Sequence, residues 1–106
     1  MNTNFNLAGL ILIAVLSITP AVAQTAGADT YKAKCQSCHG AAGMAETTIG
    51  KALKVKPATD PSVKKFTEAE MIAATKNGLG KMQPFKDKLT DAQIKDAVAY
   101  FRTFIK

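Results

Sequence analysis

The sequence has 106 residues, enough for one small domain, and a net charge of +6, because 14 Lys and Arg outnumber 8 Asp and Glu. A basic domain can bind nucleic acid, but no nucleic-acid-binding motif accompanies this charge, so we do not expect that function. An acidic protein partner or an anionic membrane surface fits the charge better, and part of the lysine excess can serve solubility alone.

The first 23 residues have the pattern of an export signal. Residues 7–18 are mostly apolar, Pro20 interrupts them, and the small-x-small run that ends at Ala23 is typical of a cleavage site. The apolar run is shorter than the about 20 residues that a transmembrane helix needs. The segment before it lacks Lys and Arg, which leaves an uncleaved anchor as the alternative. We expect a signal peptide at 1–23, cleaved after Ala23, and a periplasmic domain at 24–106.

A first helix is expected from Gly27 to Cys38, because Gly27, Tyr31 and Cys35 are spaced by four and share one helical face. Its end contains the motif C-x-x-C-H, from Cys35 to His39, which is typical of covalent haem attachment. Each thiol can add to one vinyl group of the porphyrin, and the histidine can then bind the iron. We therefore expect one haem c, with its iron, held by Cys35, Cys38 and His39.

Three other uses of this motif fit the sequence less well. A thioredoxin-like redox pair belongs beside a βαβ pattern, which the sequence lacks. A structural zinc site has four ligands, whereas Cys35, Cys38 and the chain's one histidine supply three, so a carboxylate would have to complete it. A small disulfide loop would leave His39 without a role.

About 28 residues rich in Gly, Pro, Lys and Thr follow the motif before the next helical pattern. Asp60 and Pro61 can cap and open one short helical turn there. A loop of this length is unusual in a compact domain. We expect it to wrap around the cofactor.

Two further helices have clear start signals, and no strand-like alternation is present. Thr67 and Glu70 form a capping box with Phe66 and Met71 as its hydrophobic staple, and a left-handed Gly78 is expected to end this helix. The last helix starts with a capping box of Thr90 and Gln93 and a staple of Leu89 and Ile94. Its apolar stripe has helical period and comprises Ile94, Ala97, Val98, Phe101, Phe104 and Ile105. The fold class is therefore all-α, with three main helices around one haem.

The second axial ligand of the iron must come from another residue type. Met44 lies five residues after His39, too close to reach the opposite haem face, and Met71 occupies a helix position where a core role is expected. Met82 lies in a Gly- and Pro-containing loop between two capped helices and is the expected sixth ligand. Lys81 or water is the alternative.

From Gly27 onward the sequence resembles the class I monohaem cytochromes c of the small bacterial periplasmic type. The resemblance rests on Gly27 and Tyr31 ahead of the C-x-x-C-H motif and Gly40, on residues 50–53, on Met82-x-x-Phe85 and on residues 96–100. It implies the cytochrome c fold, in which the N- and C-terminal helices cross.

The resemblance also implies roles for single residues. Gly27 is expected to permit the close approach of the crossing helices, and Tyr31 and Tyr100 to pack there. The sequence departs from the family at Gln83, because Pro often follows the methionine directly. Lys51 replaces a common Pro whose backbone carbonyl accepts the N–H of the proximal histidine, a bond that Lys51 can also make.

These features predict a soluble one-electron carrier between respiratory or photosynthetic redox partners, not an enzyme. We expect a monomer whose redox-protein partners carry acidic docking patches, with no small-molecule substrate. The lysines expected around the exposed haem edge are Lys34, Lys51, Lys54, Lys81, Lys86 and Lys88. One alternative is a membrane-anchored electron-entry subunit of a larger redox enzyme. A five-coordinate peroxidase or gas-binding haem is the other, but no distal acid–base group remains for it.

Overall fold

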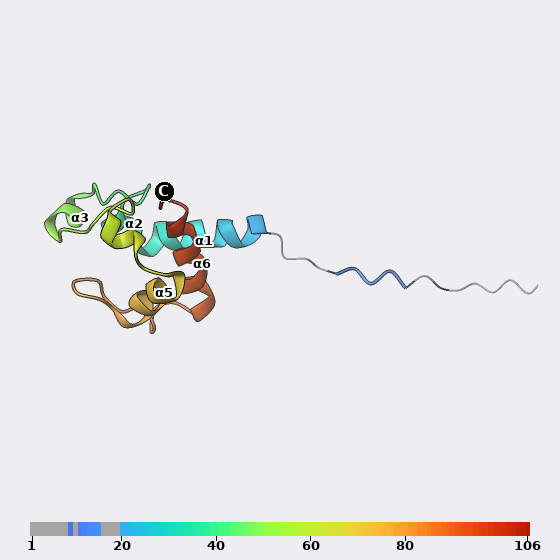
Figure 1. The fold of residues 1–106 in the computed structure, drawn as a ribbon. Coiled ribbons are helices and arrows are strands. Elements are labelled where there is room, and N and C mark those ends of the chain that lie inside the picture. The colour runs from blue at the N-terminus through green and yellow to red at the C-terminus, as the bar shows by residue number, and fades with distance from the viewer. Residues whose placement is uncertain (1–8, 10, 16–19) are drawn as a thin grey trace, which may run out of the picture.

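The computed structural model describes residues 9, 11–15 and 20–106, and in these ranges the regular structure is helical, with no β-strand. Figure 1 shows the helices gathered into one folded part. The all-α prediction is confirmed. The helices are α1 (Pro20–Lys34), α2 (Gln36–His39), α3 (Thr48–Ala52), α4 (Pro61–Lys64), α5 (Glu68–Asn77) and α6 (Asp91–Arg102).

The expected signal peptide at 1–23 lies mostly outside the described residues, so its cleavage stays a prediction. Across the described ranges, no helix combines the length and apolar character needed to cross a bilayer. The first helix differs from expectation at both ends. It begins at Pro20 instead of Gly27 and ends at Lys34, after which Cys35 separates it from the short helix α2. Proline suits the first turn of a helix, where its missing N–H costs no hydrogen bond.

Helices α1 and α6 cross, as the resemblance implied (Figure 1). Gly27 is buried at the crossing, and a Cβ atom at this position would overlap the carbonyl oxygen of Asp96 and lie 3.3 Å from the Cβ of Tyr100. The rings of Tyr31 and Tyr100 pack there with centroids 5.3 Å apart. The absence of a side chain at Gly27 therefore permits the two backbones to meet.

Both predicted capping boxes are present. The Thr67 hydroxyl accepts the N–H of Glu70 at 3.2 Å, and the Glu70 carboxylate accepts the N–H of Thr67 at 3.3 Å. At α6 the Thr90 hydroxyl accepts the N–H of Gln93 at 3.1 Å, and the Gln93 amide oxygen accepts the N–H of Thr90 at 2.9 Å. Gly78 ends α5 with φ +81°, as its type suggested, but its ψ of 157° lies outside the left-handed helical region.

The buried core joins α5, the segment that follows it and α6. Its members are Met71, Phe85, Leu89, Ile94 and Val98. A surface ion pair between Lys76 and Asp91, 3.1 Å long, also links α5 to α6. The apolar stripe of α6 thus faces the core, as its period predicted.

The long connection between α2 and α5 contains two short helices. Asp60 caps α4 by accepting the N–H of Ser62 at 2.9 Å, which confirms the predicted turn. Helix α3 was not predicted. Its start is set by Thr47, whose hydroxyl accepts the N–H of Gly50 at 2.9 Å.

Candidate haem-binding site

The C-x-x-C-H segment is anchored to α1 by its backbone. The N–H of Cys35 donates to the carbonyl of Tyr31 at 2.8 Å, and the N–H of His39 donates to the carbonyl of Cys35 at 2.9 Å. Helix α2 is this single turn, so Cys35, Cys38 and His39 are placed by local helical geometry. The sequence spacing therefore fixes the relative positions of the two thiols and the imidazole.

Two side chains hold the same segment from outside. The buried hydroxyl of Tyr31 donates to the carbonyl of Gly40 at 2.6 Å, and burial raises the pKa of Tyr31 above its usual range, so the phenol keeps its proton. The hydroxyl of Thr47 donates to the carbonyl of Ser37 at 2.5 Å. Tyr31 of α1 and Thr47, the N-cap residue of α3, thus hold the segment within the motif and directly after it.

A two-part cavity opens beside His39. The apolar part, of about 200 Å³, is lined by Tyr31, Cys35, His39, Val55, Lys56, Val63, Phe66, Met71, Ala74, Thr75, Leu79, Met82, Ala97, Val98 and Phe101. The lysine-lined part, of about 610 Å³, is lined by Lys34, Cys35, Ser37, Cys38, His39, Leu53, Lys54, Val55, Lys56, Leu79, Lys81, Met82, Gln83 and Phe85. The two parts share six of these residues, so they adjoin each other beside His39 and Met82.

The site's electrostatics favour a neutral imidazole at His39. Burial lowers the pKa of His39, and its ring meets Phe101 edge-on with centroids 5.3 Å apart. Its Nδ1 atom is buried without a hydrogen-bond partner in the part of the chain that the structure describes. A neutral imidazole has the free lone pair that iron requires.

The bond from His39 to Lys51 that the resemblance implied is not formed. The Lys51 carbonyl lies at the end of α3 and accepts the N–H of Lys54 at 3.2 Å. The carbonyl is therefore used by the turn that follows α3, and the expectation was wrong for this structure.

The two cysteines are not joined in a disulfide. Burial, with a smaller contribution from Cys38, raises the pKa of the Cys35 thiol to about 11. Among the residues that the structure describes, no three His, Cys, Asp or Glu side chains gather around a common point that could hold a metal ion. The carboxylate that a zinc site would need is therefore not beside the motif.

Met82 is placed by a tight turn. The N–H of Leu79 donates to the carbonyl of Met82 at 3.1 Å, and the N–H of Met82 donates back to Leu79 at 2.9 Å. Gly80 makes the turn with φ +56°. The N–H of Phe85 donates to Thr75 of α5 at 2.9 Å, which fixes the far end of the loop. Met82 lines both parts of the cavity, as His39 does.

The other methionines differ in position. Met44 is 42% exposed and does not line the cavity. Met71 is buried in the core and borders the apolar part of the cavity. The structure thus brings His39, Met71 and Met82 around the same space.

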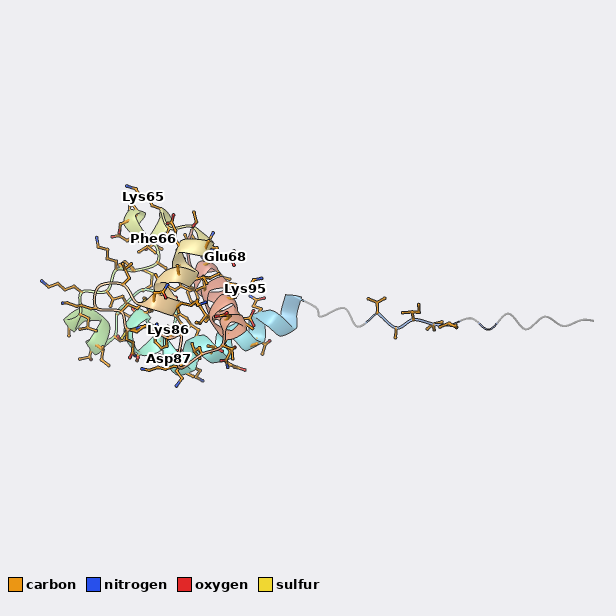
Figure 2. All side chains as sticks on the ribbon, turned by 90° about the horizontal axis from the view of Figure 1, so that it is seen from below. Lys65, Phe66, Glu68, Lys86, Asp87 and Lys95 are labelled. Carbon is orange, nitrogen blue, oxygen red and sulfur yellow. The ribbon has the colours of Figure 1, made fainter. Side chains whose placement is uncertain are left out.

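The lysines around the cavity are partly those expected. Lys34, Lys54 and Lys81 line it, whereas Lys51, Lys86 and Lys88 do not. Lys86 is exposed and lies beside Asp87 in Figure 2. The ammonium of Lys88 instead donates to Gln83 at 2.7 Å.

The sequence reasoning missed Lys56, which lines both parts of the cavity, and the apolar residues Val55 and Val63 of the long connection. The alternation of Lys54, Val55 and Lys56 was a weak signal that this segment borders an apolar surface. The expectation that the connection wraps around the cofactor site agrees with these positions.

The residues present fit a haem. An apolar cavity holds a neutral, unpaired imidazole and a thioether, and two thiols at the fixed C-x-x-C spacing stand at its edge. The thiols suit thioether formation with vinyl groups, and the apolar lining suits a porphyrin plane.

Comparisons with known proteins agree with this chemistry. The model of a family described as "Cytochrome C oxidase, cbb3-type, subunit III" matches residues 22–101. Cytochrome c6 of Leptolyngbya boryana is 37% identical over 75 residues, which cover 71% of this chain and 85% of that protein. The solved structure of the KustC0563 c-type cytochrome has a TM-score of 0.68 at 32% identity, covering 76% of this chain and 98% of that one. The chain therefore belongs to the class I c-type cytochromes, as a small monohaem member that carries a covalently bound haem c and acts as an electron carrier, not as an enzyme.

Proposed function

We propose that this protein is an exported, soluble one-electron carrier in which Cys35 and Cys38 attach the haem and His39 and Met82 supply the two axial ligands. The observation that carries the proposal is the shared cavity, which His39 and Met82 both line and at whose edge the two cysteines stand. When bound, the haem supplies a ferric–ferrous couple whose potential a Met/His ligand pair raises.

The chain's own residues prepare this site for electron transfer. The Leu79–Met82 turn holds the backbone of the loop that carries Met82, and the Tyr31 and Thr47 hydrogen bonds hold the C-x-x-C-H segment. A site that is fixed before the reaction needs little rearrangement when the charge changes. The apolar lining, which includes Val63, Ala97 and Val98, excludes water.

The proposed partners are redox proteins that approach the lysine-lined part of the cavity. Lys34, Lys54, Lys56 and Lys81 border it, and no Asp or Glu is among its lining residues. A partner with an acidic patch fits this charge, and such contacts are small and short-lived. Periplasmic export rests on the sequence pattern of residues 1–23.

Absorption spectra of the exported protein test the axial ligands and the attachment together. The ferric spectrum should show a thioether-to-iron charge-transfer band, and acid–acetone should leave the haem on the polypeptide. Haem extraction by acid–acetone would contradict attachment through Cys35 and Cys38. Absence of the band with the haem retained would contradict Met82 alone.

A second candidate is an electron-entry subunit of a larger redox enzyme. The description of the matching family, a subunit of a cytochrome oxidase, favours it. The mass of the protein purified from cells separates the two candidates. A chain that begins after Ala23 and fractionates without membranes supports the free carrier, whereas an intact chain that copurifies with an oxidase supports the subunit.

A further inference from the structure

We propose that the ammonium group of Lys56 binds a carboxylate of the haem and neutralises the negative charge of that carboxylate. The haem's two carboxylates are negatively charged at neutral pH. A carboxylate that leaves water for an apolar cavity is strongly destabilised unless a cation or hydrogen-bond donors replace the water. The site must therefore offer such a group where the haem carboxylates lie.

The apolar part of the cavity offers one free candidate. Its lining includes the hydroxyls of Tyr31 and Thr75, but these donate to backbone carbonyls at 2.6 Å and 2.8 Å. His39 is the proposed iron ligand. Among the described residues, Lys56 is the only charged side chain that lines this part.

The chemistry of the porphyrin separates Lys56 from the other lysines. Its vinyl groups and its carboxylates lie on opposite pairs of pyrrole rings, so the carboxylates point away from the thioether bonds. Lys34 directly precedes Cys35 and therefore lies at the thioether edge. Lys81 belongs to the turn that presents Met82. By elimination, the segment from Lys54 to Lys56 is the lysine-bearing segment that can border the carboxylate edge of the porphyrin.

The backbone of this segment is fixed. The N–H of Val55 donates to Gly50 at 2.9 Å, and the N–H of Ala58 donates to Gly43 at 2.7 Å. Lys54 adopts φ +56°, a left-handed conformation that costs free energy in a residue with a side chain. Lys56 lines both parts of the cavity, whereas Lys54 lines only the lysine-lined part. Lys56 therefore stands at the boundary between the two.

Within the described ranges, no acidic side chain forms an ion pair with Lys56. The pKa of Asp60 is lowered mainly by hydrogen bonds from Ser62, and the charge of Lys56 makes only a minor contribution to this shift. The described residues contain one ion pair, between Lys76 and Asp91, and it does not involve Lys56. The ammonium of Lys56 is thus available to an anion in the cavity.

The pairing has a consequence for the redox potential that needs no partner protein. A carboxylate without its cation stabilises the more positive ferric iron, so removing the Lys56 charge should favour the oxidised state. We expect Lys56→Gln to lower the ratio of reduced to oxidised protein about threefold at a fixed solution potential. That ratio corresponds to about 28 mV, since a tenfold change is 59 mV for one electron.

The test uses the mature holoprotein and three variants: Lys56→Gln, Lys54→Gln and Lys95→Gln. Lys95 projects from the surface of α6 in Figure 2 and does not line the cavity. Each variant removes one positive charge, so effects of net charge are matched. The readouts are the midpoint potential and the carboxylate bands of the redox-difference infrared spectrum, with the haem carboxylates labelled with ¹³C.

The expected result is a potential drop and a shifted haem-carboxylate band in Lys56→Gln, both larger than in the other two variants. Lys56→Arg, which keeps the charge, should retain most of the potential. Equal potentials and an unshifted labelled band in Lys56→Gln and Lys95→Gln would overturn the proposal, as would a band shift found only in Lys54→Gln. The proposal rests on the covalently bound haem c of the family. Its test does not depend on whether Met82 is the sixth ligand or on which partner docks.

Discussion

Met82 is the residue on which the proposed redox chemistry depends most directly. Met82→Ala removes the thioether while the backbone hydrogen bonds to Leu79 can persist. We expect loss of the thioether-to-iron charge-transfer band, binding of cyanide and carbon monoxide, and a lower potential, because the Met ligand raises it. Absorption spectra and redox titration measure these effects, and circular dichroism should show the helices intact.

Met71→Ala is the matched control, because Met71 also lines the cavity but packs in the core. It should retain the charge-transfer band and lower the free energy of unfolding by about 2–5 kcal/mol. Loss of the band in Met71→Ala, with the band kept in Met82→Ala, would assign the ligand to Met71.

The hydroxyl of Tyr31 is a second residue-scale determinant. Tyr31→Phe keeps the ring packing but removes one of two donors to the Gly40 carbonyl, which keeps the N–H of Gly43 at 3.2 Å. We expect the free energy of unfolding to fall by about 0.5–1.5 kcal/mol, the net contribution of one hydrogen bond. Denaturant titration measures the change. Tyr100→Phe removes a half-buried hydroxyl and should cost less, so equal losses would argue against the Gly40 bond.

At this scale the sequence predicts the candidate cofactor-binding residues but not the residues around them. The C-x-x-C-H motif and Met82 could be proposed from the sequence because each is a local feature. The positions of Lys51 and Lys56 could not be predicted, because they depend on how the connection before α4 folds back. Lys51 was expected to accept from His39 but instead accepts from Lys54.

The crossing of α1 and α6 is the main contact between elements, and Gly27 permits it. Gly27→Val places a branched side chain against the Asp96 carbonyl, and overpacking costs about 1–3 kcal/mol. The thermal midpoint should fall by roughly 4–8 °C per kcal/mol in a domain of this size. Calorimetry measures the change. Ala26→Val, on the exposed side of α1, controls for helix propensity. An equal midpoint in both variants would mean that the crossing tolerates a side chain.

The helices that the sequence predicted well are those with local start signals. Each start signal is a capping box that spans only four residues, Thr67 to Glu70 at α5 and Thr90 to Gln93 at α6. These two helix starts can therefore be read from the local sequence alone. Helix α3 was missed because its five residues have no apolar period, although Thr47 caps it. The start of α1 at Pro20 was missed because residues 20–23 were assigned to the end of a signal peptide.

The whole molecule is basic, but its lysines are not equivalent. Lys34, Lys54, Lys56 and Lys81 border the cavity, whereas Lys32 on α1 and Lys86 after the Met82 loop do not. Charges close to the docking face steer a partner more strongly than distant ones. The molecule should therefore respond to the position of a charge as well as to net charge.

Charge reversal at single lysines tests this idea. Lys81→Glu should slow bimolecular electron transfer to an acidic-patched partner at low salt and flatten its salt dependence. Lys32→Glu and Lys86→Glu change the net charge equally but lie away from the cavity, so they should slow the reaction less. Screening acts over about 10 Å at 0.1 M ionic strength, so all differences should shrink as salt rises. Stopped-flow rates across a salt series measure them. Equal slowing by all three variants would show that net charge alone is sensed, and the docking face at the cavity would have to be abandoned.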